Sequence, residues 1–384
     1  LAVLATGAAV AQAPPGAGAG YPIDPVSVPR PALAALRISD GISIDGVLDE
    51  AVWSQADTST GTWIQVTPAP GMPATEPTSV RILYDEGNLY IGARLYDSDT
   101  GHLYVPGLEP DFDTPSSDLF GIAFDSYHDG QSGFVFAVNP AGALYDAQTF
   151  NDGRDVLPAW EGIADVRTSV SEDSWFVEMS IPFKSLRFRP GPSQIWGVQL
   201  GRELPGRIEE VYLTPVPISA GAGQYRISAG ATLTGLEVPA GNRTFEIKPY
   251  AIGSLATDRI ATPPISNAGS ADFGVDVKYG LTENLTADFT YNTDFAQVEV
   301  DEQQVNLTRF SLFFPEKRDF FLESQGIFDF GQSPGSGFSS SASGATAPNI
   351  FFSRRIGLKQ GQTVPILGGG RLTGKVGDFN IGAI

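Results

Sequence analysis

Short runs in which apolar residues occupy every second position are the feature that most constrains this chain. Val80, Ile82 and Tyr84 form one such run, and Leu89 and Ile91 resume the same period after the turn residues 85–88. A two-residue period places apolar side chains on one face of a strand, and a cluster of Asp, Gly and Asn between two runs is typical of a hairpin turn. The pattern therefore predicts an antiparallel hairpin.

Further runs repeat this signature along the first half of the chain. One lies at 120–124 and returns at 134–138 across a turn at His128–Gly130, and two more begin at Trp175 and Trp196. The 44 glycines and 29 prolines suit many strands joined by turns, and no stretch shows sustained helical spacing. We expect an all-β chain that begins with an antiparallel β-sandwich.

The strands after Pro239 have a different character. Two arms of about nine residues flank a turn at 282–284, and nine residues are enough for a tilted strand to cross the hydrocarbon core. One register puts every charge on one side. We therefore expect two faces, lipid-facing Phe273, Val275, Val277, Leu285, Ala287 and Phe289, and inward-facing Asp276, Lys278, Asp288 and Thr290.

Composition divides the chain into four predicted segments. Residues 1–13 are small and apolar, as in the tail of a secretory signal peptide, and 14–34 form a linker rich in Pro, Gly and Ala. Residues 35–238 are the sandwich, and 239–384 are the first strands of an outer-membrane β-barrel. A barrel needs at least about eight strands, so we expect this one to be truncated here, with the sequence continuing beyond it.

Charge and cysteine content restrict the partners. With 44 acidic and 24 basic residues the formal net charge is −20, whereas nucleic-acid binding needs a basic surface. The absence of cysteine excludes disulfides, thiolate metal sites and cysteine nucleophiles. No phosphate loop, dinucleotide fingerprint or other catalytic constellation is visible, so we expect no enzymatic activity and no nucleic-acid partner.

Three strings in the first half resemble the family 9 carbohydrate-binding-like modules: Ile44–Trp53, Val80–Gly92 and Asp118–Asp125. The resemblance implies a β-sandwich and an oligo- or polysaccharide partner. The resemblance implies that sugar-binding members of that family hold a sugar between two tryptophans. Here the matching neighbourhoods, 114–117 and 220–224, contain no tryptophan, and Tyr225 is the nearest aromatic residue. We therefore expect weak binding of simple sugars.

Two later strings resemble a family of uncharacterised bacterial proteins of the DUF5916 type. They are Phe313–Glu323 and Phe352–Gly357, and they occur in order behind the module. In that family such a module precedes an outer-membrane barrel. The two resemblances together cover nearly everything from Ala35 to Ile384.

Candidate sugar-binding residues follow from aromatic and polar side chains that lie near one another in the sequence. Trp63 and Trp160 are candidates for an exposed stacking platform, with Asp155 and Glu161 as hydrogen-bonding neighbours and Tyr225 as the aromatic residue of the second clamp neighbourhood. Core packing is the alternative for each aromatic residue, because most large aromatic side chains are buried.

Two charged groups complete the candidates. Asp111, Asp113 and Asp118 share one loop and offer oxygen ligands for Ca²⁺, the one candidate cofactor, although solvated turns give the same pattern. The second group predicts either a charged constriction or plug-like loop inside the barrel, or a salt-bridge set in its interior or rim; it comprises Lys317, Arg318, Asp319, Arg354 and Arg355.

The leading hypothesis is a non-enzymatic envelope protein. Its barrel would lie in the outer membrane, in contact with lipid, and anchor the protein or pass solute, while the sandwich would lie in the periplasm or against the barrel and bind a ligand such as a glycan. The alternative is a secreted accessory module of a glycoside hydrolase that acts in carbohydrate catabolism. The strands after residue 270 distinguish the two, because a catalytic domain would not need strands with one apolar and one charged face.

Overall fold

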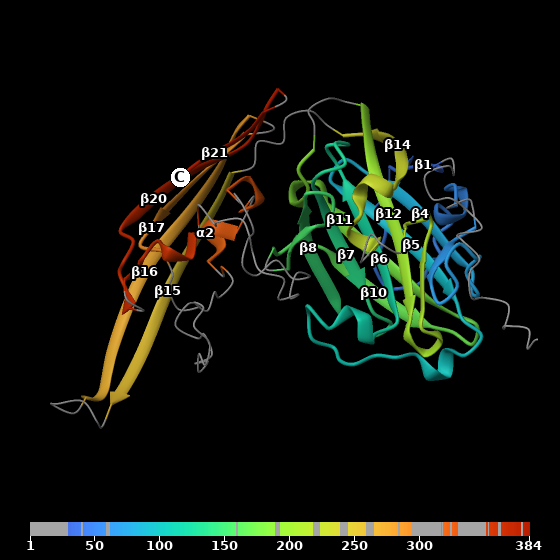
Figure 1. The fold of residues 1–384 in the computed structure, drawn as a ribbon, viewed down its shortest axis with the longest axis horizontal. Coiled ribbons are helices and arrows are strands. Elements are labelled where there is room, and N and C mark those ends of the chain that lie inside the picture. The colour runs from blue at the N-terminus through green and yellow to red at the C-terminus, as the bar shows by residue number, and fades with distance from the viewer. Residues whose placement is uncertain are drawn as a thin grey trace, which may run out of the picture.

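The computed structural model (Figure 1) describes most of the chain between residue 30 and residue 384. The described residues are 30–39, 41–58, 62–158, 160–188, 193–217, 223–238, 245–258, 265–282, 285–293, 316, 318–322, 325–328, 351, 353–359, 362–377 and 379–384. The predicted leader 1–13, most of the linker and Lys317 lie outside them. Ala32–Ala34, predicted as the end of the linker, form a strand instead.

The largest sheet has nine strands, of which seven follow one another in hydrogen-bonded order. That order is β1 (Ala32–Ala34), β14 (Ala231–Glu237), β12 (Ser193–Leu204), β6 (Leu119–Asp125), β7 (Gly133–Val138), β8 (Leu144–Phe150) and β9 (Asp155–Leu157). The other two, β13 (Glu209–Tyr212) and β3 (Ile64–Thr67), pair with one another, and β13 also pairs with β12.

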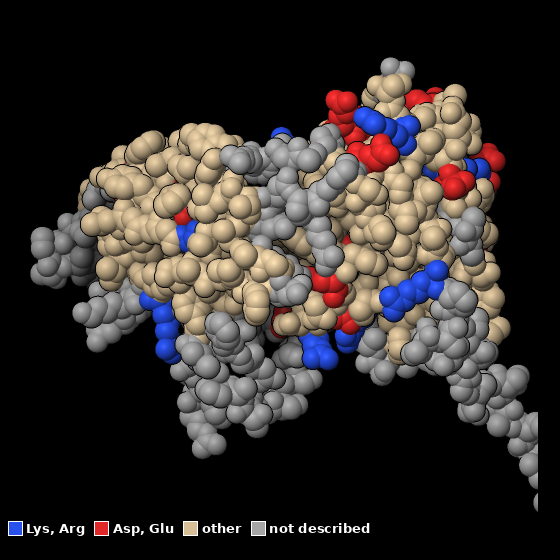
Figure 2. Space-filling model, turned by 90° about the horizontal axis from the view of Figure 1, so that it is seen from above, with Lys and Arg blue, Asp and Glu red and all other residues tan. Residues whose placement is uncertain are grey.

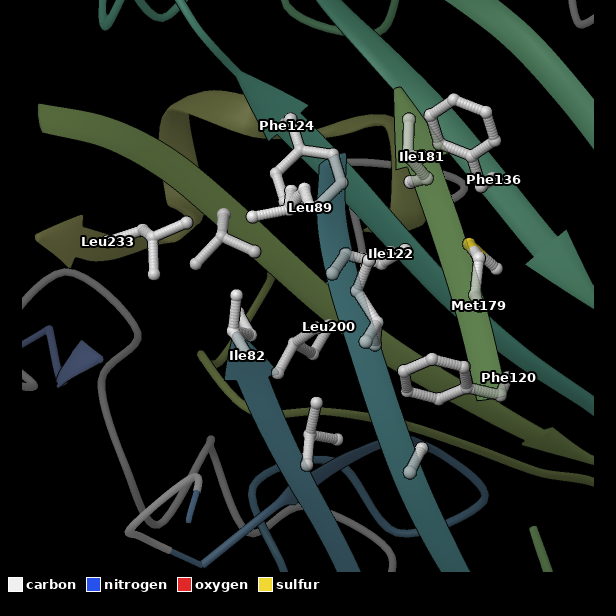
Figure 3. Close-up of a cluster of buried hydrophobic side chains, with 14 of the residues drawn as sticks. Ile82, Leu89, Phe120, Ile122, Phe124, Phe136, Met179, Ile181, Leu200 and Leu233 are labelled. Atoms are coloured by element: carbon white, nitrogen blue, oxygen red, sulfur yellow. The ribbon is translucent and has the colours of Figure 1, made fainter. Parts of the chain in front are cut away.

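A five-stranded sheet packs against the first and closes the sandwich. Its order is β10 (Asp165–Val170), β11 (Ser174–Pro182), β5 (Asn88–Tyr96), β4 (Thr78–Tyr84) and β2 (Leu36–Arg37). Apolar side chains from both sheets meet between them with at most 2% of their surface exposed (Figure 3). Each buried side chain of this size contributes roughly 1.5–3 kcal/mol, so the predicted sandwich is held by its core.

The two predicted hairpins are confirmed, and an aspartate organises each turn. β4 and β5 pair across the turn, where the Asp85 carboxylate accepts the backbone N–H groups of Gly87 and Asn88, each at 2.7 Å. β6 and β7 pair in the same way, and the Asp125 carboxylate accepts the backbone N–H of Gly130 at 2.7 Å. Both carboxylates satisfy amides that the sheet leaves unpaired.

A buried cation joins the two sheets at one end of the sandwich. Arg202 of β12 is 1% exposed, and its guanidinium donates to the Tyr96 carbonyl at 2.7 Å and the Asp97 carboxylate at 3.2 Å. Burial lowers the pKa of Arg202 to about 10, and the attraction of Asp97 opposes that shift. Since a buried charge is tolerated only with such partners, the two sheets are tied together here.

A third sheet, drawn apart from the sandwich in Figure 1, follows in the chain. Its order is β15 (Phe245–Asp258), β16 (Ile265–Thr282), β17 (Leu285–Tyr291), β20 (Gly368–Val376) and β21 (Phe379–Ala383). Between β17 and β20 the described residues form α2 (Asp319–Leu322), η9 (Gln325–Phe328), η10 (Ser353–Arg355) and the small hairpin β18 (Leu358–Lys359)–β19 (Gln362–Thr363). No helix among the described residues is long and apolar enough to cross a membrane.

Removing the buried cation should destabilise the sandwich strongly. Arg202→Ala removes the buried partner of Asp97 and leaves that carboxylate only a longer ion pair, at 3.7 Å, with the partly exposed Arg207. We expect the free energy of unfolding to fall by roughly 3–5 kcal/mol. Urea unfolding followed by tryptophan fluorescence measures this, because all five tryptophans lie between residues 53 and 196. The matched control is Arg167→Ala, which removes an exposed pair with Asp165 and should cost less than about 1 kcal/mol. Equal costs for the two variants would contradict the assigned role.

Candidate functional site

A pair of glycines creates room on the outer face of the nine-stranded sheet. Gly121 of β6 and Gly201 of β12 lie directly opposite each other, and their side of the sheet faces away from the sandwich core. A Cβ on Gly201 would come within 2.3 Å of Gln224 Oε1, and one on Gly121 within 2.7 Å of the same side chain. The two glycines are therefore what allows Gln224 to lie flat against the strands.

Two glutamates lie beside this side chain. Glu203 is two residues beyond Gly201 on the same face of β12, and its cross-strand partner on β13 is Glu210. The Tyr212 hydroxyl donates to Glu210. Burial raises the pKa of Glu203 to about 8, and the nearby carboxylates of Glu210 and Asp113 raise it further.

Tyr225 extends the group toward the loop before β6. Its hydroxyl donates to the Tyr145 hydroxyl at 3.0 Å, and it also hydrogen-bonds with the side chain of Thr114. Burial raises the pKa of both tyrosines, so both remain neutral. We call Glu203, Glu210, Tyr212, Gln224 and Tyr225 the outer-face cluster. The two neighbourhoods predicted to flank a sugar, around 114 and 224, thus meet in the fold.

The two tryptophan candidates lie elsewhere. Trp63 is 3% exposed and packs in the core between the sheets, so the predicted stacking platform is wrong there. Trp160 is half-buried against Phe134 and Phe136, with ring centroids 5.1 Å and 5.8 Å away. Trp63 is thus part of the core, and Trp160 packs against it.

The polar candidates near Trp160 separate in the fold. The Asp155 carboxylate accepts a hydrogen bond from the Asn151 amide. Glu161 is exposed and lies close enough to Asp146 to raise the pKa of that carboxyl, after burial as the main cause. Only Tyr225, of the five predicted sugar-binding residues, belongs to the outer-face cluster.

The three aspartates predicted as calcium ligands are not brought together as a ligand set. Asp118 is buried and accepts the backbone N–H of Tyr104 at 2.7 Å, and burial raises its pKa to about 6. Asp111 accepts the backbone N–H of Asp146 instead, and Asp113 is exposed. Within the described part of the chain, no group of three or more His, Cys, Asp or Glu side chains could hold a metal ion.

The third sheet exposes its apolar face. Phe245, Phe273, Phe289 and Tyr291 are each between 56% and 63% exposed, and Phe379 is 76% exposed. Val275, Val277 and Leu285 on the same face are half-buried, and only the small Ala287 is buried. The registers place the predicted apolar set on one side, as the two-residue period requires. Figure 2 shows this body almost free of charged side chains on the side in view, whereas the sandwich carries clusters of them.

The other face of this sheet is polar and covered. A row of alternating charge crosses four strands, in the order Glu246, Lys278, Asp288 and Arg371. Arg371 pairs with Asp288 at 2.9 Å, both nearly inaccessible, and Lys278 pairs with Glu246 at 3.6 Å. Asp276 and Thr290 share this face, as predicted. The Asp288–Arg371 pair is nearly inaccessible, whereas the side chains of Glu246 and Lys278 are 54% and 29% exposed. A buried ion pair under an exposed apolar face is the reverse of a water-soluble sheet.

The segments between β17 and β20 cover this polar face. The Phe320 ring of α2 lies 5.5 Å from the Arg371 guanidinium carbon and contacts the position of a Cβ on Gly369. On β21, a Cβ at Gly382 would meet Ile327 and Phe328 of η9. Phe320 and Phe321 are 7% and 4% exposed. Aromatic side chains therefore shield the Asp288–Arg371 end of the charged row from water.

The predicted charged group forms one buried node and two separate residues. Arg318 pairs with Glu316 at 2.8 Å and donates to the carbonyls of Ile356 at 2.7 Å and Ser353 at 3.0 Å. The Ser353 hydroxyl donates to Glu316 at 2.7 Å. Arg354 is buried nearby in the sequence, Arg355 is exposed, and Asp319 begins α2. The two strings chosen from the sequence thus contact each other directly.

These features define an antiparallel β-sandwich followed in the chain by an amphipathic sheet. Residues 44–201 match the family model described as carbohydrate family 9 binding domain-like. Residues 245–365 match the model described as domain of unknown function DUF5916. Both resemblances noted in the sequence are therefore confirmed. No curated protein matches the chain.

Several solved structures are similar to the sandwich. A family 9 module from Caldicellulosiruptor kristjanssonii, in complex with cellotriose, is 15% identical, with a TM-score of 0.38 over 55% of this chain and 96% of that one. The glucose complex is 16% identical, with a TM-score of 0.38 over 55% of this chain and 98% of that one. A candidate carbohydrate-binding protein from Bacteroides uniformis ATCC 8492 is 13% identical, with a TM-score of 0.43 over 54% of this chain and 99% of that one.

Sequence reasoning missed Glu203, Glu210, Tyr212 and Gln224. The one signal available was the pair of isolated glycines inside apolar strands, at 121 and 201, since such glycines often mark a close approach of another group. Nothing in the sequence indicates which side chain approaches them.

Glu203 should make stability depend on pH. The folded pKa of Glu203, about 8, lies above its value of 4.5 in an unfolded chain. Glu203 therefore lowers the free energy of unfolding progressively as pH rises from 4.5 to about 8, and it has no such effect below pH 4.5. We expect Glu203→Gln to raise the melting temperature by about 2–8 °C near pH 9, roughly 1–2 kcal/mol. Near pH 4 the two proteins should melt alike, and Glu172→Gln, an exposed control, should change neither value. Equal melting of Glu203→Gln and wild type at both pH values would contradict the raised pKa.

Proposed function

We propose that this chain is a bacterial envelope protein in which the third sheet is part of the wall of an outer-membrane β-barrel and the family 9-like sandwich binds a glycan. The observation that carries the membrane part is the reversal of the third sheet, whose large apolar side chains are exposed while its Asp288–Arg371 ion pair is buried. Lipid is the environment in which that partition is stable.

The dimensions of the exposed face agree with a membrane wall. Phe245 and Tyr279 contact each other in one cross-strand row, with ring centroids 6.3 Å apart. Phe273 is exposed six residues further along β16, and Tyr291 is exposed opposite Val275, four residues along. Six residues span about 20 Å, close to the roughly 25 Å apolar band that separates two aromatic girdles in such barrels.

The covered face favours an anchor with a restricted interior over an open pore. Phe320 and Phe321 lie on the face that would line the barrel, and the Glu316–Arg318 node holds the adjoining segment to Ser353 and Ile356. This arrangement supports the hypothesis that the predicted charged group belongs to a plug-like loop inside the barrel. The sandwich also contacts this side of the sheet, because the Arg187 guanidinium donates to the Thr286 hydroxyl.

The glycan part rests on the family 9-like match and on the outer-face cluster. Carboxylates, an amide and tyrosine hydroxyls gathered beside a glycine-lined strand surface are the groups that hydrogen-bond sugar hydroxyls. The alternative of a secreted hydrolase accessory module is disfavoured, because it leaves the apolar face of the third sheet in water.

The membrane proposal predicts an asymmetric response to substitution. Phe289→Arg places a charge on the apolar face, at a cost of roughly 2–4 kcal/mol if that face meets lipid near the midplane. We expect less folded protein in the outer-membrane fraction and loss of heat-modifiable gel mobility. Phe289→Leu and Lys278→Gln are the controls, on the apolar and polar faces, and both should assemble. Normal assembly of Phe289→Arg would refute the lipid-facing assignment.

Thr290→Arg, which the two-residue period suggests as a tolerated change, is not a usable control. Thr290 is 5% exposed, its hydroxyl lies 3.0 Å from that of Thr293, and its methyl group is close to Gly369. An arginine there would meet the segments that cover the polar face.

The glycan proposal predicts that the outer-face cluster, and not Trp160, controls affinity. Gln224→Leu replaces the amide with an apolar side chain of similar size. We expect the affinity of the full-length protein for oligosaccharides to fall about tenfold, which corresponds to the loss of one hydrogen bond. Titration calorimetry measures the affinity, and urea unfolding should show no loss of stability. Trp160→Phe, the control, should bind as wild type. If Trp160→Phe lost binding and Gln224→Leu did not, the glycan site would lie at Trp160 and not at the outer-face cluster.

A further inference from the structure

Glu203 is half-buried and differs from the buried carboxylates of the sandwich in having no partner. Glu178 accepts two backbone N–H groups and the Trp53 indole, and Asp97 pairs with Arg202. Among the described residues, none donates a hydrogen bond or brings a cation to Glu203, and the groups that face it are the acids Glu210 and Asp113. A half-buried carboxyl group beside like charges is disfavoured in its ionised form, and a bound cation would compensate it.

Gln224 provides an independent sign of a missing ligand. Its side chain is 7% exposed, and both its amide nitrogen and its amide oxygen are buried without a hydrogen-bond partner. The amide lies over Gly201, two residues from Glu203 on the same face of β12. More than nine in ten buried polar groups are satisfied in folded proteins. The unsatisfied amide nitrogen and oxygen of Gln224 therefore indicate a ligand beside Glu203.

The chemistry of the missing ligand follows from what the cluster lacks. A neutral sugar offers hydroxyl groups, which can satisfy Gln224 but bring no positive charge to Glu203 and Glu210. A protonated amine brings one charge and three N–H donors, and hydrogen bonds between ions are stronger than neutral ones.

We propose that the outer-face cluster binds a sugar bearing a free, protonated amino group, such as a hexosamine whose nitrogen is not acylated. Glu203 and Glu210 accept the ammonium hydrogens, and Gln224 bonds the neighbouring hydroxyl groups. This inference rests on the proposed glycan-binding function and narrows it to a cationic class of sugar. It also agrees with the expected weak binding of simple neutral sugars.

The test compares three sugars that differ at one position. Titration calorimetry on the full-length protein at neutral pH uses glucosamine, glucose and N-acetylglucosamine. A charge-assisted hydrogen bond contributes roughly 1.5–3 kcal/mol, so glucosamine should bind about ten- to a hundredfold more tightly than either neutral sugar. Glu203→Gln should abolish this preference, so that glucosamine binds no more tightly than glucose, whereas the exposed control Glu172→Gln should keep it.

The possible outcomes separate the inference from the function on which it rests. Equal binding of the three sugars, or a preference that survives Glu203→Gln, overturns the inference and leaves glycan binding in place. If none of the three sugars nor any longer oligosaccharide binds, glycan binding itself is refuted. Because Glu203→Gln is expected to be at least as stable as wild type, a loss of preference cannot be attributed to unfolding.

Discussion

Every strand of this protein has two faces, and the group that covers each face determines what the sheet can do. Backbone pairing satisfies the peptide groups and forces side chains to alternate. In the sandwich, the apolar faces of two sheets cover each other, and Ile82, Phe124 and Leu233 lie in the shared core. The remaining features of the sandwich, the outer-face cluster included, depend on that core to hold β6, β12 and β13 in register.

The same constraint has the opposite result in the third sheet. The alternating signs of the row Glu246–Lys278–Asp288–Arg371 neutralise its charges, and Phe320 shields the buried end at Asp288 and Arg371. The apolar face is left without a protein partner among the described residues, so its large side chains are exposed. One sequence period thus produces a soluble core in one half and an amphipathic wall in the other, because the covering groups differ.

The outer-face cluster illustrates how a site can work against stability. The buried amide of Gln224 has no hydrogen-bond partner, and half-buried Glu203 has only acids beside it, so its ionised form is disfavoured. The neighbouring Arg202, on the opposite face of the same strand, has its charge compensated by Asp97. β12 therefore carries a compensated ion toward the core and a carboxyl group without a compensating charge outward, and the outward side is where a ligand can contribute most.

The sequence by itself determined the hairpins, the strand faces and the two family resemblances, because all of these depend on the local two-residue period or on contiguous strings. It could not determine which aromatic residues are exposed, since Trp63 and Trp160 become core residues only when the sheets pack. Nor could it bring Glu203 to Gln224, or Arg318 to Ser353, because these contacts join elements far apart in the chain. Only the tertiary structure decides such juxtapositions, since chain spacing says nothing about which faces of distant strands and loops come together.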